Sequence, residues 1–220
     1  MPRSTKVVVA PRAPESWKAN PTEWLSNEDI DSVLKQYETA HPDFVHLGSS
    51  PIDFDANDES TSTCVFSALC HFNLSAWLAK KKRRFGVVLN TDVHTGGGKH
   101  WMALFIDATT PKGRIVFFDS VGDAASDEIQ TFVKRVQSQG QALGRSFAYY
   151  SNASHQHQFG NTECGMYSLF FIKYMLEHPK STGRVFREKR FQDKLMQQYR
   201  TVFFRSEEHT SELQSHLNLV

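Results

Sequence analysis

The polar run QFGNTECG at residues 158–165 leads directly into the apolar run MYSLFFI at residues 166–172. A segment that is apolar on every side is typical of a protein interior, so the second run predicts a helix that is buried all round. Asn161 or Thr162 is expected to cap its start. His178-Pro179 is expected to end it, because proline cannot continue a helix.

Cys164 falls in the first turn of this predicted helix. Unpaired N–H groups and the helix dipole favour an anion there, so a thiol at this position is easier to ionise. The thiolate is the nucleophilic form of cysteine. The position therefore indicates that Cys164 is a catalytic nucleophile, although a cysteine in an apolar helix is more often core packing.

Two apolar runs at residues 100–106 and 114–119 predict a pair of antiparallel strands. His100 opens the first strand and Asp119 closes the second, so both fall at the same end of the sheet. If residue 107 pairs with residue 114, Asp119 faces Met102 and is a diagonal neighbour of His100. A shift of one residue would place the two side chains on opposite faces.

A carboxylate beside a histidine fixes the tautomer of the ring and favours its charged form. His100, oriented by Asp119, could then hold Cys164 as a thiolate and protonate the leaving amine. Each of the three residues alone has an ordinary structural explanation. Together they predict a Cys–His–Asp active site.

The remaining patterns complete an α+β fold in one domain. Ser26 and Asp29 have the spacing of a capping box at the start of a helix that ends at His41-Pro42. Further helices are predicted at residues 64–78, 124–139 and 185–199, and further strands at residues 85–90 and 146–150.

We expect three regions along the chain. Residues 1–22 contain four prolines and are predicted to form a flexible arm. Residues 23–204 form the single folded domain. Residues 205–220 look like a translated sequencing adapter, so we exclude them from the native sequence.

Composition limits the range of functions. The chain has 220 residues and a formal net charge of +1, which is ordinary for a globular protein and points to no particular partner. No apolar run is long enough to cross a membrane. Three cysteines are too few and odd in number for a disulfide framework, so we expect a reducing compartment and assign Cys64 and Cys70 to the core.

Two other functional interpretations, a basic patch and a metal site, have less support in the sequence than the active site. The basic run Lys80–Arg84 could be a nuclear-import or nucleic-acid patch, but cations at a helix C-terminus are common, and a solvated helix end is favoured. The only possible metal site in the sequence would combine His155, His157 and Cys164. They lack the paired spacing of a zinc site, so no metal is predicted.

The sequence resembles the ubiquitin-like-protein-specific cysteine proteases, which include SUMO proteases, the adenovirus-type protease and relatives in large DNA viruses. The resemblance extends from about Trp24 to Phe204. Its signature is His100-Trp101, the strand end at residues 118–120, and Gln158 six residues before Cys164-Gly165.

This resemblance implies a papain-like fold with a central mixed or antiparallel sheet and a buried helix that starts at Cys164. It also implies that Cys164 is the nucleophile, His100 the general base and acid, and Asp119 the residue that orients His100. Gln158 would donate its side-chain amide to an oxyanion hole together with the backbone N–H of Cys164. Trp24 and Trp101 would line the channel that binds a Gly-Gly segment.

The expected activity is cysteine endopeptidase cleavage of peptide or isopeptide bonds after small residues, with no cofactor. The substrate would be a ubiquitin-like modifier or a viral polyprotein. Asn27 stands where SUMO proteases carry an aspartate, which fits the viral members better. We expect a monomer inside the host cell, in the cytoplasm, nucleus or virion.

Two alternatives remain open at this point. Bacterial effector acetyltransferases resemble the same group and use the same His–acid–Cys order, although no extra segment is evident for an acetyl-CoA pocket. A non-catalytic adaptor could also bind a ubiquitin-like protein through the same groove. The retention of His100, Asp119, Gln158 and Cys164 favours an enzyme.

Overall fold

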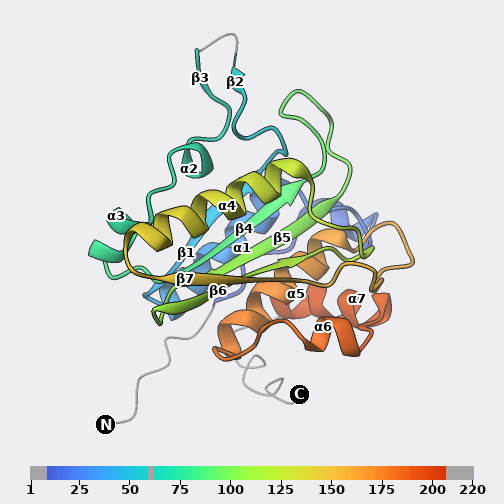
Figure 1. Ribbon diagram of the computed structural model, residues 1–220. Helices are drawn as coiled ribbons and strands as arrows, with labels where there is room; N and C mark the ends of the chain where they lie inside the picture. Colours follow the sequence, from blue (N-terminus) through green and yellow to red (C-terminus); the bar gives the residue numbers. More distant parts are fainter. Residues whose placement is uncertain (1–8, 59–61, 207–220) are drawn as a thin grey trace.

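The computed structural model describes residues 9–58 and 62–206. A five-stranded mixed sheet with the strand order β1-β4-β5-β6-β7 forms its centre (Figure 1). The central pairs β4–β5 and β5–β6 are antiparallel, and the outer pairs β1–β4 and β6–β7 are parallel. The strands are β1 (Phe44–Ser50), β4 (Arg84–Asn90), β5 (Trp101–Asp107), β6 (Lys112–Phe118) and β7 (Ser146–Ser151), and a separate short hairpin is formed by β2 (Asn57–Asp58) and β3 (Thr63–Cys64).

Helices cover both faces of the sheet (Figure 1). One apolar cluster joins the sheet to the helices α1, α5, α6 and α7, and a second cluster joins the opposite face to α2, α3 and α4. The helices are η1 (Glu15–Lys18), α1 (Asn27–Ala40), α2 (Ser67–Cys70), α3 (Leu74–Ala79), α4 (Asp127–Ala142), α5 (Cys164–Glu177), α6 (Val185–Glu188) and α7 (Asp193–Phe203). This arrangement confirms the predicted α+β class with a mixed central sheet.

The helix α5 is buried as predicted. Every residue from Cys164 to Ile172 is buried, and the helix ends at Glu177, just before His178-Pro179. The predicted cap is wrong, because the N-cap residue is Glu163 and no side chain caps the first turn. The polar run therefore continues past Asn161 and Thr162 before the helix begins.

The strand register is also as predicted. Asp107 pairs with Arg114, and Ala103 pairs with Phe118 at the other end of the hairpin. The same register carried one step further places Asp119 beside Met102. The side chains of His100 and Asp119 consequently meet on one face of the sheet.

Two predicted helices are each divided in two. Residues 64–78 form a strand end followed by α2 and α3, and residues 185–199 form α6 and the start of α7. In the second case Phe191 turns inward and donates its N–H to Nδ1 of the buried His157. This contact takes the chain out of helical geometry. The capping box at the start of α1 is confirmed, since Ser26 and Asp29 bond reciprocally.

The N-terminal boundary lies earlier than predicted. Ala10 is buried, and the ring of Trp17 packs 4.8 Å from that of Phe204. The N–H of Arg205 donates to the carbonyl of Pro11. A flexible arm extending to residue 22 is therefore wrong for the segment that carries Pro11, Ala13 and Trp17, which contacts Phe204 and Arg205 at the end of α7. Residues 207–220 of the suspected adapter lie outside the described residues.

The prediction of no disulfide is wrong. Cys64 and Cys70 are bonded to each other, with Cα atoms 6.6 Å apart, and both are half-buried rather than in the core. The chain leaves β3 at Cys64, and the short helix α2 that follows brings Cys70 back to it. The number of cysteines in the chain does not show that Cys64 and Cys70 lie close together.

Part of the basic run Lys80–Arg84 forms hydrogen bonds and an ion pair within the fold. Lys82 donates from Nζ to the carbonyls of Pro42 and Phe44, and Arg84 pairs with Asp43. These contacts favour a structural explanation over a nucleic-acid patch. No helix within residues 9–58 and 62–206 combines the length and the apolarity needed to cross a bilayer.

Candidate active site

A histidine and an aspartate meet at the end of the β5–β6 hairpin. His100 immediately precedes β5, Asp119 immediately follows β6, and Nε2 of His100 lies 2.7 Å from Oδ1 of Asp119. Asp119 is buried, and the same Oδ1 accepts a hydrogen bond from the N–H of Val121. The carboxylate is thus held in one orientation against the ring.

Asn152 fixes the backbone of Asp119. Its Oδ1 accepts from the N–H of Asp119, and its Nδ2 donates to the carbonyl of the same residue. Asn152 was missed in the sequence, although it directly follows β7, which runs parallel to β6. The ends of parallel neighbouring strands meet at one edge, so a polar residue there is a usable signal.

Cys164 lies on the other side of His100. Its thiol is free, and the residue is 3% exposed. Cys164 is the first residue of α5, which packs against β5. Cys164 is close enough to His100 for its thiol to raise the pKa of the ring. Because Nε2 is engaged by Asp119, Nδ1 is the ring nitrogen that remains available to the thiol.

The surroundings of His100 favour its charged form. Burial alone would lower the pKa of the imidazole, but the hydrogen bonds and charges of Asp119 and Cys164 outweigh it and raise the pKa to about 10. The ring is therefore an imidazolium at neutral pH. An imidazolium stabilises a thiolate beside it.

Gln158 is buried close to the same strand end. Its N–H donates to the carbonyl of Ser120, and its Oε1 accepts from the Ser120 hydroxyl at 2.7 Å. This contact directs the amide NH2 away from Ser120, and one of its hydrogens goes to the carbonyl of Gly160. Ser120 follows Asp119, so one strand end positions both side chains.

A buried ion pair precedes the thiol. Nε of Arg200 lies 3.2 Å from Oε2 of Glu163, and both residues are buried. Burial raises the pKa of Glu163, although Arg200 opposes the shift. Arg200 also donates to the carbonyl of Glu23 and lies over the ring of Trp17 at 4.6 Å. Sequence analysis missed this pair, because residues 163 and 200 share no periodic pattern.

The two predicted substrate-binding tryptophans differ in exposure. Trp101 is buried and donates from Nε1 to the carbonyl of Leu25 at 3.0 Å, whereas Trp24 is 46% exposed. Leu25 in turn packs on Gly165, where an added Cβ would lie 3.0 Å from the Leu25 side chain. The segment carrying Trp24 therefore runs beside the start of α5.

His157 is a structural residue. It is fully buried, Nε2 bonds the carbonyl of Phe186, and Nδ1 accepts from the N–H of Phe191. Burial lowers its pKa to about 4, so the ring is neutral. Both nitrogens are occupied, so His157 has none left for the metal set with His155 and Cys164. Among the described residues, no group of three His, Cys, Asp or Glu side chains could hold a metal ion.

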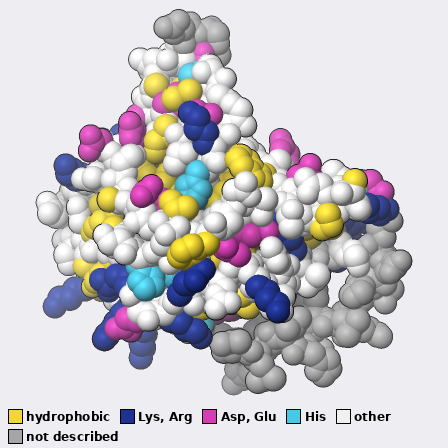
Figure 2. All heavy atoms as spheres, turned by 90° about the vertical axis from the view of Figure 1, so that its right-hand side faces the viewer, with side chains coloured by type: hydrophobic (Ala, Val, Ile, Leu, Met, Phe, Trp, Pro, Cys, Tyr) yellow, Lys and Arg dark blue, Asp and Glu magenta, His cyan; other side chains and the backbone are white. Residues whose placement is uncertain are grey.

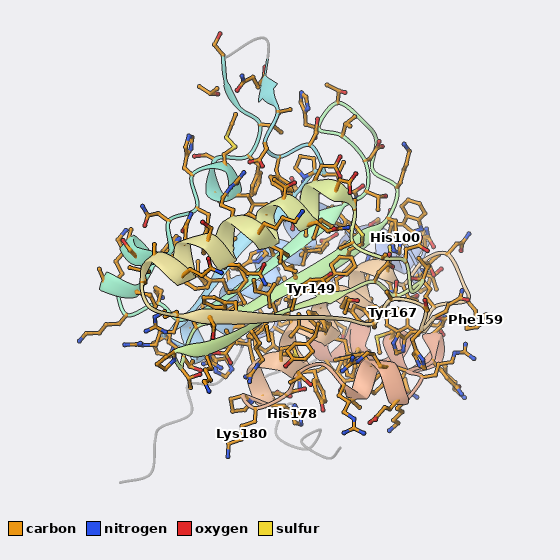
Figure 3. All side chains as sticks on the ribbon, viewed as in Figure 1. His100, Tyr149, Phe159, Tyr167, His178 and Lys180 are labelled. Atoms are coloured by element: carbon orange, nitrogen blue, oxygen red, sulfur yellow. A yellow bond between two sulfur atoms is a disulfide. The ribbon has the colours of Figure 1, made fainter. Side chains whose placement is uncertain are left out.

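The site opens on one side of the molecule. His100 and Phe159 lie on the same side in Figure 3, and Figure 2 views the molecule from that side. Hydrophobic side chains reach the surface there among charged ones (Figure 2). A cavity of about 410 Å³ adjoins His100 and Asp119, and its apolar wall includes Ile52, Met102 and Val121.

A thiol, an imidazole and a carboxylate joined in this order define a cysteine-dependent enzyme of the papain-like class. The chain belongs to the family whose model is described as YopJ serine/threonine acetyltransferase, and the match covers residues 14–215. Its curated relatives are proteases. A cysteine protease of African swine fever virus (isolate Tick/Malawi/Lil 20-1/1983) is 29% identical over 191 residues, which cover 84% of this chain and 69% of the relative.

Other comparisons agree. A protein named SUMO-1 cysteine protease from another isolate of that virus (Pig/Kenya/KEN-50/1950) is also 29% identical over 191 residues, with the same coverage of both chains. The crystal structure of the African swine fever virus protease matches with a TM-score of 0.76 and 25% identity, covering 90% of this chain and 72% of that one. The Ulp1 protease domain in complex with yeast Smt3 matches with a TM-score of 0.51 and 15% identity, covering 80% and 79%, which shows the fold alone. These findings confirm the resemblance and the fold, and the chain is a cysteine-type peptidase.

Proposed function

We propose that the chain uses Cys164, His100, Asp119 and Gln158 to cleave peptide or isopeptide bonds after Gly-Gly-type sites. The observation that carries the proposal is the position of His100, whose Nε2 lies 2.7 Å from Oδ1 of Asp119 and whose pKa is raised by both Asp119 and the nearby Cys164. This arrangement is what a thiol protease needs, because one ring can stabilise the nucleophile and then supply a proton.

The reaction would proceed in two steps. Sγ of Cys164 attacks the carbonyl carbon, the C–N bond breaks, and His100 gives its proton to the leaving nitrogen. Water, deprotonated by the now neutral His100, then attacks the thioester. The acid product leaves, and the thiolate and imidazolium are restored. Asp119 keeps its charge throughout and holds the ring in place.

An oxyanion hole completes the proposed site. The first N–H groups of a helix have no partner within the helix, so the N–H of Cys164 is available to a substrate oxygen. Gln158 uses one amide hydrogen on Gly160, which leaves the second hydrogen for the same oxygen. These two donors would stabilise the negative charge that develops on the carbonyl.

The substrate is proposed to be a protein with a Gly-Gly segment. Small residues suit a site whose approach is bordered by the exposed Trp24, while the buried Trp101 acts through the Leu25 carbonyl. One relative is named a SUMO-1 protease, which supports a ubiquitin-like modifier as substrate. A viral polyprotein is the other substrate class, since the curated relatives are viral. We propose a monomer that acts inside an infected cell, in the cytoplasm, nucleus or virion, which light scattering and cell fractionation would test.

The central test is cleavage of a Gly-Gly-aminomethylcoumarin peptide and of a modifier fusion. Wild-type protein should release product, and Cys164→Ala and His100→Ala should not. A modifier or peptide with a C-terminal electrophile should label wild-type protein at Cys164. Equal cleavage by wild type and Cys164→Ala would refute the proposal.

A second activity is suggested by the description of the matching family model, which names serine/threonine acetyltransferases. The same thiol could accept an acetyl group from acetyl-CoA and pass it to a hydroxyl. Incubation with radiolabelled acetyl-CoA, with and without Cys164→Ala, tests this. Acetyl transfer without peptide cleavage would favour the acetyltransferase, and cleavage without transfer would favour the protease.

A further inference from the structure

The loop that carries Gln158 is held from outside the proposed active site by Asp193, the first residue of α7. Oδ2 of Asp193 accepts hydrogen bonds from the N–H groups of Phe159 (3.0 Å) and Gly160 (2.8 Å). Its other oxygen, Oδ1, lies 2.9 Å from the hydroxyl of Tyr167, whose single hydrogen is shared between this oxygen and the carbonyl of Phe191, also at 2.9 Å. One carboxylate thus joins the loop to α5, the helix that begins at Cys164.

These contacts are unusual for an acidic residue at a helix start. Such a residue ordinarily stabilises the free N–H groups of its own helix. Asp193 instead makes the hydrogen bonds described above to a loop more than 30 residues earlier and to another helix. The contacts therefore point to a function in the loop rather than in α7.

Asp193 is connected to the Gln158 amide through a single residue. It fixes the N–H of Gly160, and the carbonyl of Gly160 accepts one of the two Nε2 hydrogens of Gln158 at 2.9 Å. Ser120 holds the opposite end of the same amide through Oε1. The direction of the remaining amide hydrogen consequently depends on where Asp193 holds Gly160.

The same loop would be mobile without this contact. Phe159 is 64% exposed, and its ring lies under the guanidinium of Arg190 at 3.9 Å. Its side chain is not anchored in either apolar cluster. The Gln158 end of this backbone is also held by Ser120 and Gln156, whereas the N–H groups of Phe159 and Gly160 are held by the two hydrogen bonds that Asp193 accepts.

We propose that Asp193 is a positioning residue of the oxyanion hole, which acts by fixing the Gly160 carbonyl that orients the Gln158 amide. This inference rests on the proposed function. Asp193 does not touch the reacting atoms, and it lies apart from the His100–Asp119 pair. Its loss should affect the step in which charge develops on the carbonyl oxygen and leave the reactivity of the thiol unchanged.

The experiment compares Asp193→Ala and Asp193→Asn with wild type on the Gly-Gly-aminomethylcoumarin peptide. We expect kcat to fall about tenfold in Asp193→Ala with KM nearly unchanged, since loss of a whole oxyanion donor costs about 100-fold or more. Asp193→Asn keeps one acceptor oxygen, so its kcat should fall less. Alkylation of Cys164 by iodoacetamide, which needs no oxyanion hole, should proceed at the wild-type rate in both variants.

Tyr167→Phe is the matched control. It removes the contacts of the hydroxyl with Oδ1 of the same carboxylate and with the carbonyl of Phe191, but leaves the contacts to Phe159 and Gly160 in place. We expect a lower melting temperature with kcat within about twofold of wild type. In a Gln158→Ala background, Asp193→Ala should cause no further loss, because the amide that it positions is already absent.

Each outcome decides the question. An unchanged kcat in Asp193→Ala, a parallel fall in alkylation, or an additive loss in the Gln158→Ala background overturns the inference while the proposed function stands. Equal release by wild type and Cys164→Ala overturns the proposed function and this inference with it.

Discussion

Nε2 of His100 lies 2.7 Å from Oδ1 of Asp119, although the two residues are 19 positions apart in the chain. The pairing follows from the β5–β6 register, which places both residues at one end of the hairpin. Asn152 holds the backbone of Asp119 from the neighbouring strand. The orientation of the imidazole is thus determined by three adjacent strands rather than by a flexible loop.

Asp119→Asn should reduce kcat strongly while the fold is retained. The amide keeps the shape of the carboxylate but removes its charge and can favour the wrong imidazole tautomer. In serine proteases the corresponding change costs about 10⁴-fold. We expect a loss on the order of 10³-fold, measured with the coumarin peptide, and an unchanged circular dichroism spectrum. Activity within tenfold of wild type would show that Asp119 does not orient His100.

The pH dependence of stability should report the protonation of His100. The folded-state pKa of His100 is about 10, above the value of 6.5 for an unperturbed histidine. The stability from its charged contacts is therefore fully present below pH 6.5 and is lost as the pH rises through about 10. Between these values the contribution of His100 to the free energy of unfolding should fall with a slope of up to about 1.4 kcal/mol per pH unit.

Urea denaturation at several values from pH 6.5 to pH 10 measures that slope. Asp119→Asn should have a flatter slope, because the carboxylate that raises the pKa of His100 is gone. Parallel curves for the two proteins would contradict the assignment of the raised pKa to this pair.

Ser120→Ala should weaken catalysis through Gln158. The Ser120 hydroxyl donates to Oε1 of Gln158 and fixes which end of the amide is the NH2. Without it the amide can rotate, so we expect kcat to fall about tenfold and KM to stay near its wild-type value. Ser32→Ala, which removes a serine hydrogen bond within α1, is the control. A similar loss of kcat in both variants would indicate a general effect on the fold.

The sequence predicts the reacting residues better than the residues that support them. His100, Asp119 and Cys164 lie at the ends of strongly apolar strands and a helix, so periodicity and register place them. The role of Gln158 is implied by the family resemblance, whose motif includes its offset from Cys164. Asn152 and Asp193 each form two hydrogen bonds to a backbone segment more than 30 residues away, and such contacts leave no periodic trace in the chain.

The same limitation explains the errors in the fold. The buried helix and the sheet follow from the pattern of apolar residues, which records burial. The packing of Trp17 on Phe204 and the Cys64–Cys70 bond depend on where distant or turning segments meet. Local composition records neither contact. The proline content therefore wrongly predicted a flexible arm, and the cysteine count wrongly predicted the absence of a disulfide.

Trp24 and Trp101 should give different results on mutation. Trp24 is 46% exposed, so Trp24→Ala should raise KM for the Gly-Gly peptide with little change in melting temperature. Trp101 is buried and donates to the Leu25 carbonyl, so Trp101→Phe should destabilise the fold by about 1 kcal/mol. Steady-state kinetics and thermal unfolding of both variants measure this. An unchanged KM in Trp24→Ala would remove Trp24 from the substrate site.

Arg200→Met should destabilise the protein more than any of these changes. It leaves the carboxylate of Glu163, which is 1% exposed, without its partner, and breaking a buried ion pair in this way costs about 3–5 kcal/mol. It also frees the Glu23 carbonyl, which precedes Trp24. The double variant Glu163→Gln/Arg200→Met removes the unpaired charge, so it should recover part of the lost stability.

The loss of stability caused by Arg200→Met should also depend on pH. Burial already raises the pKa of Glu163, and loss of Arg200 removes an influence that lowers it. A carboxyl group with a raised folded-state pKa gains stability as the pH falls towards its unfolded value, because the protonated form needs no cationic partner. Urea denaturation at pH 7 and pH 5 should therefore give a smaller difference from wild type at pH 5. A deficit that is equal at both values, or that persists in the double variant, would mean that lost packing of Arg200 on Trp17, and not the buried charge, causes the destabilisation.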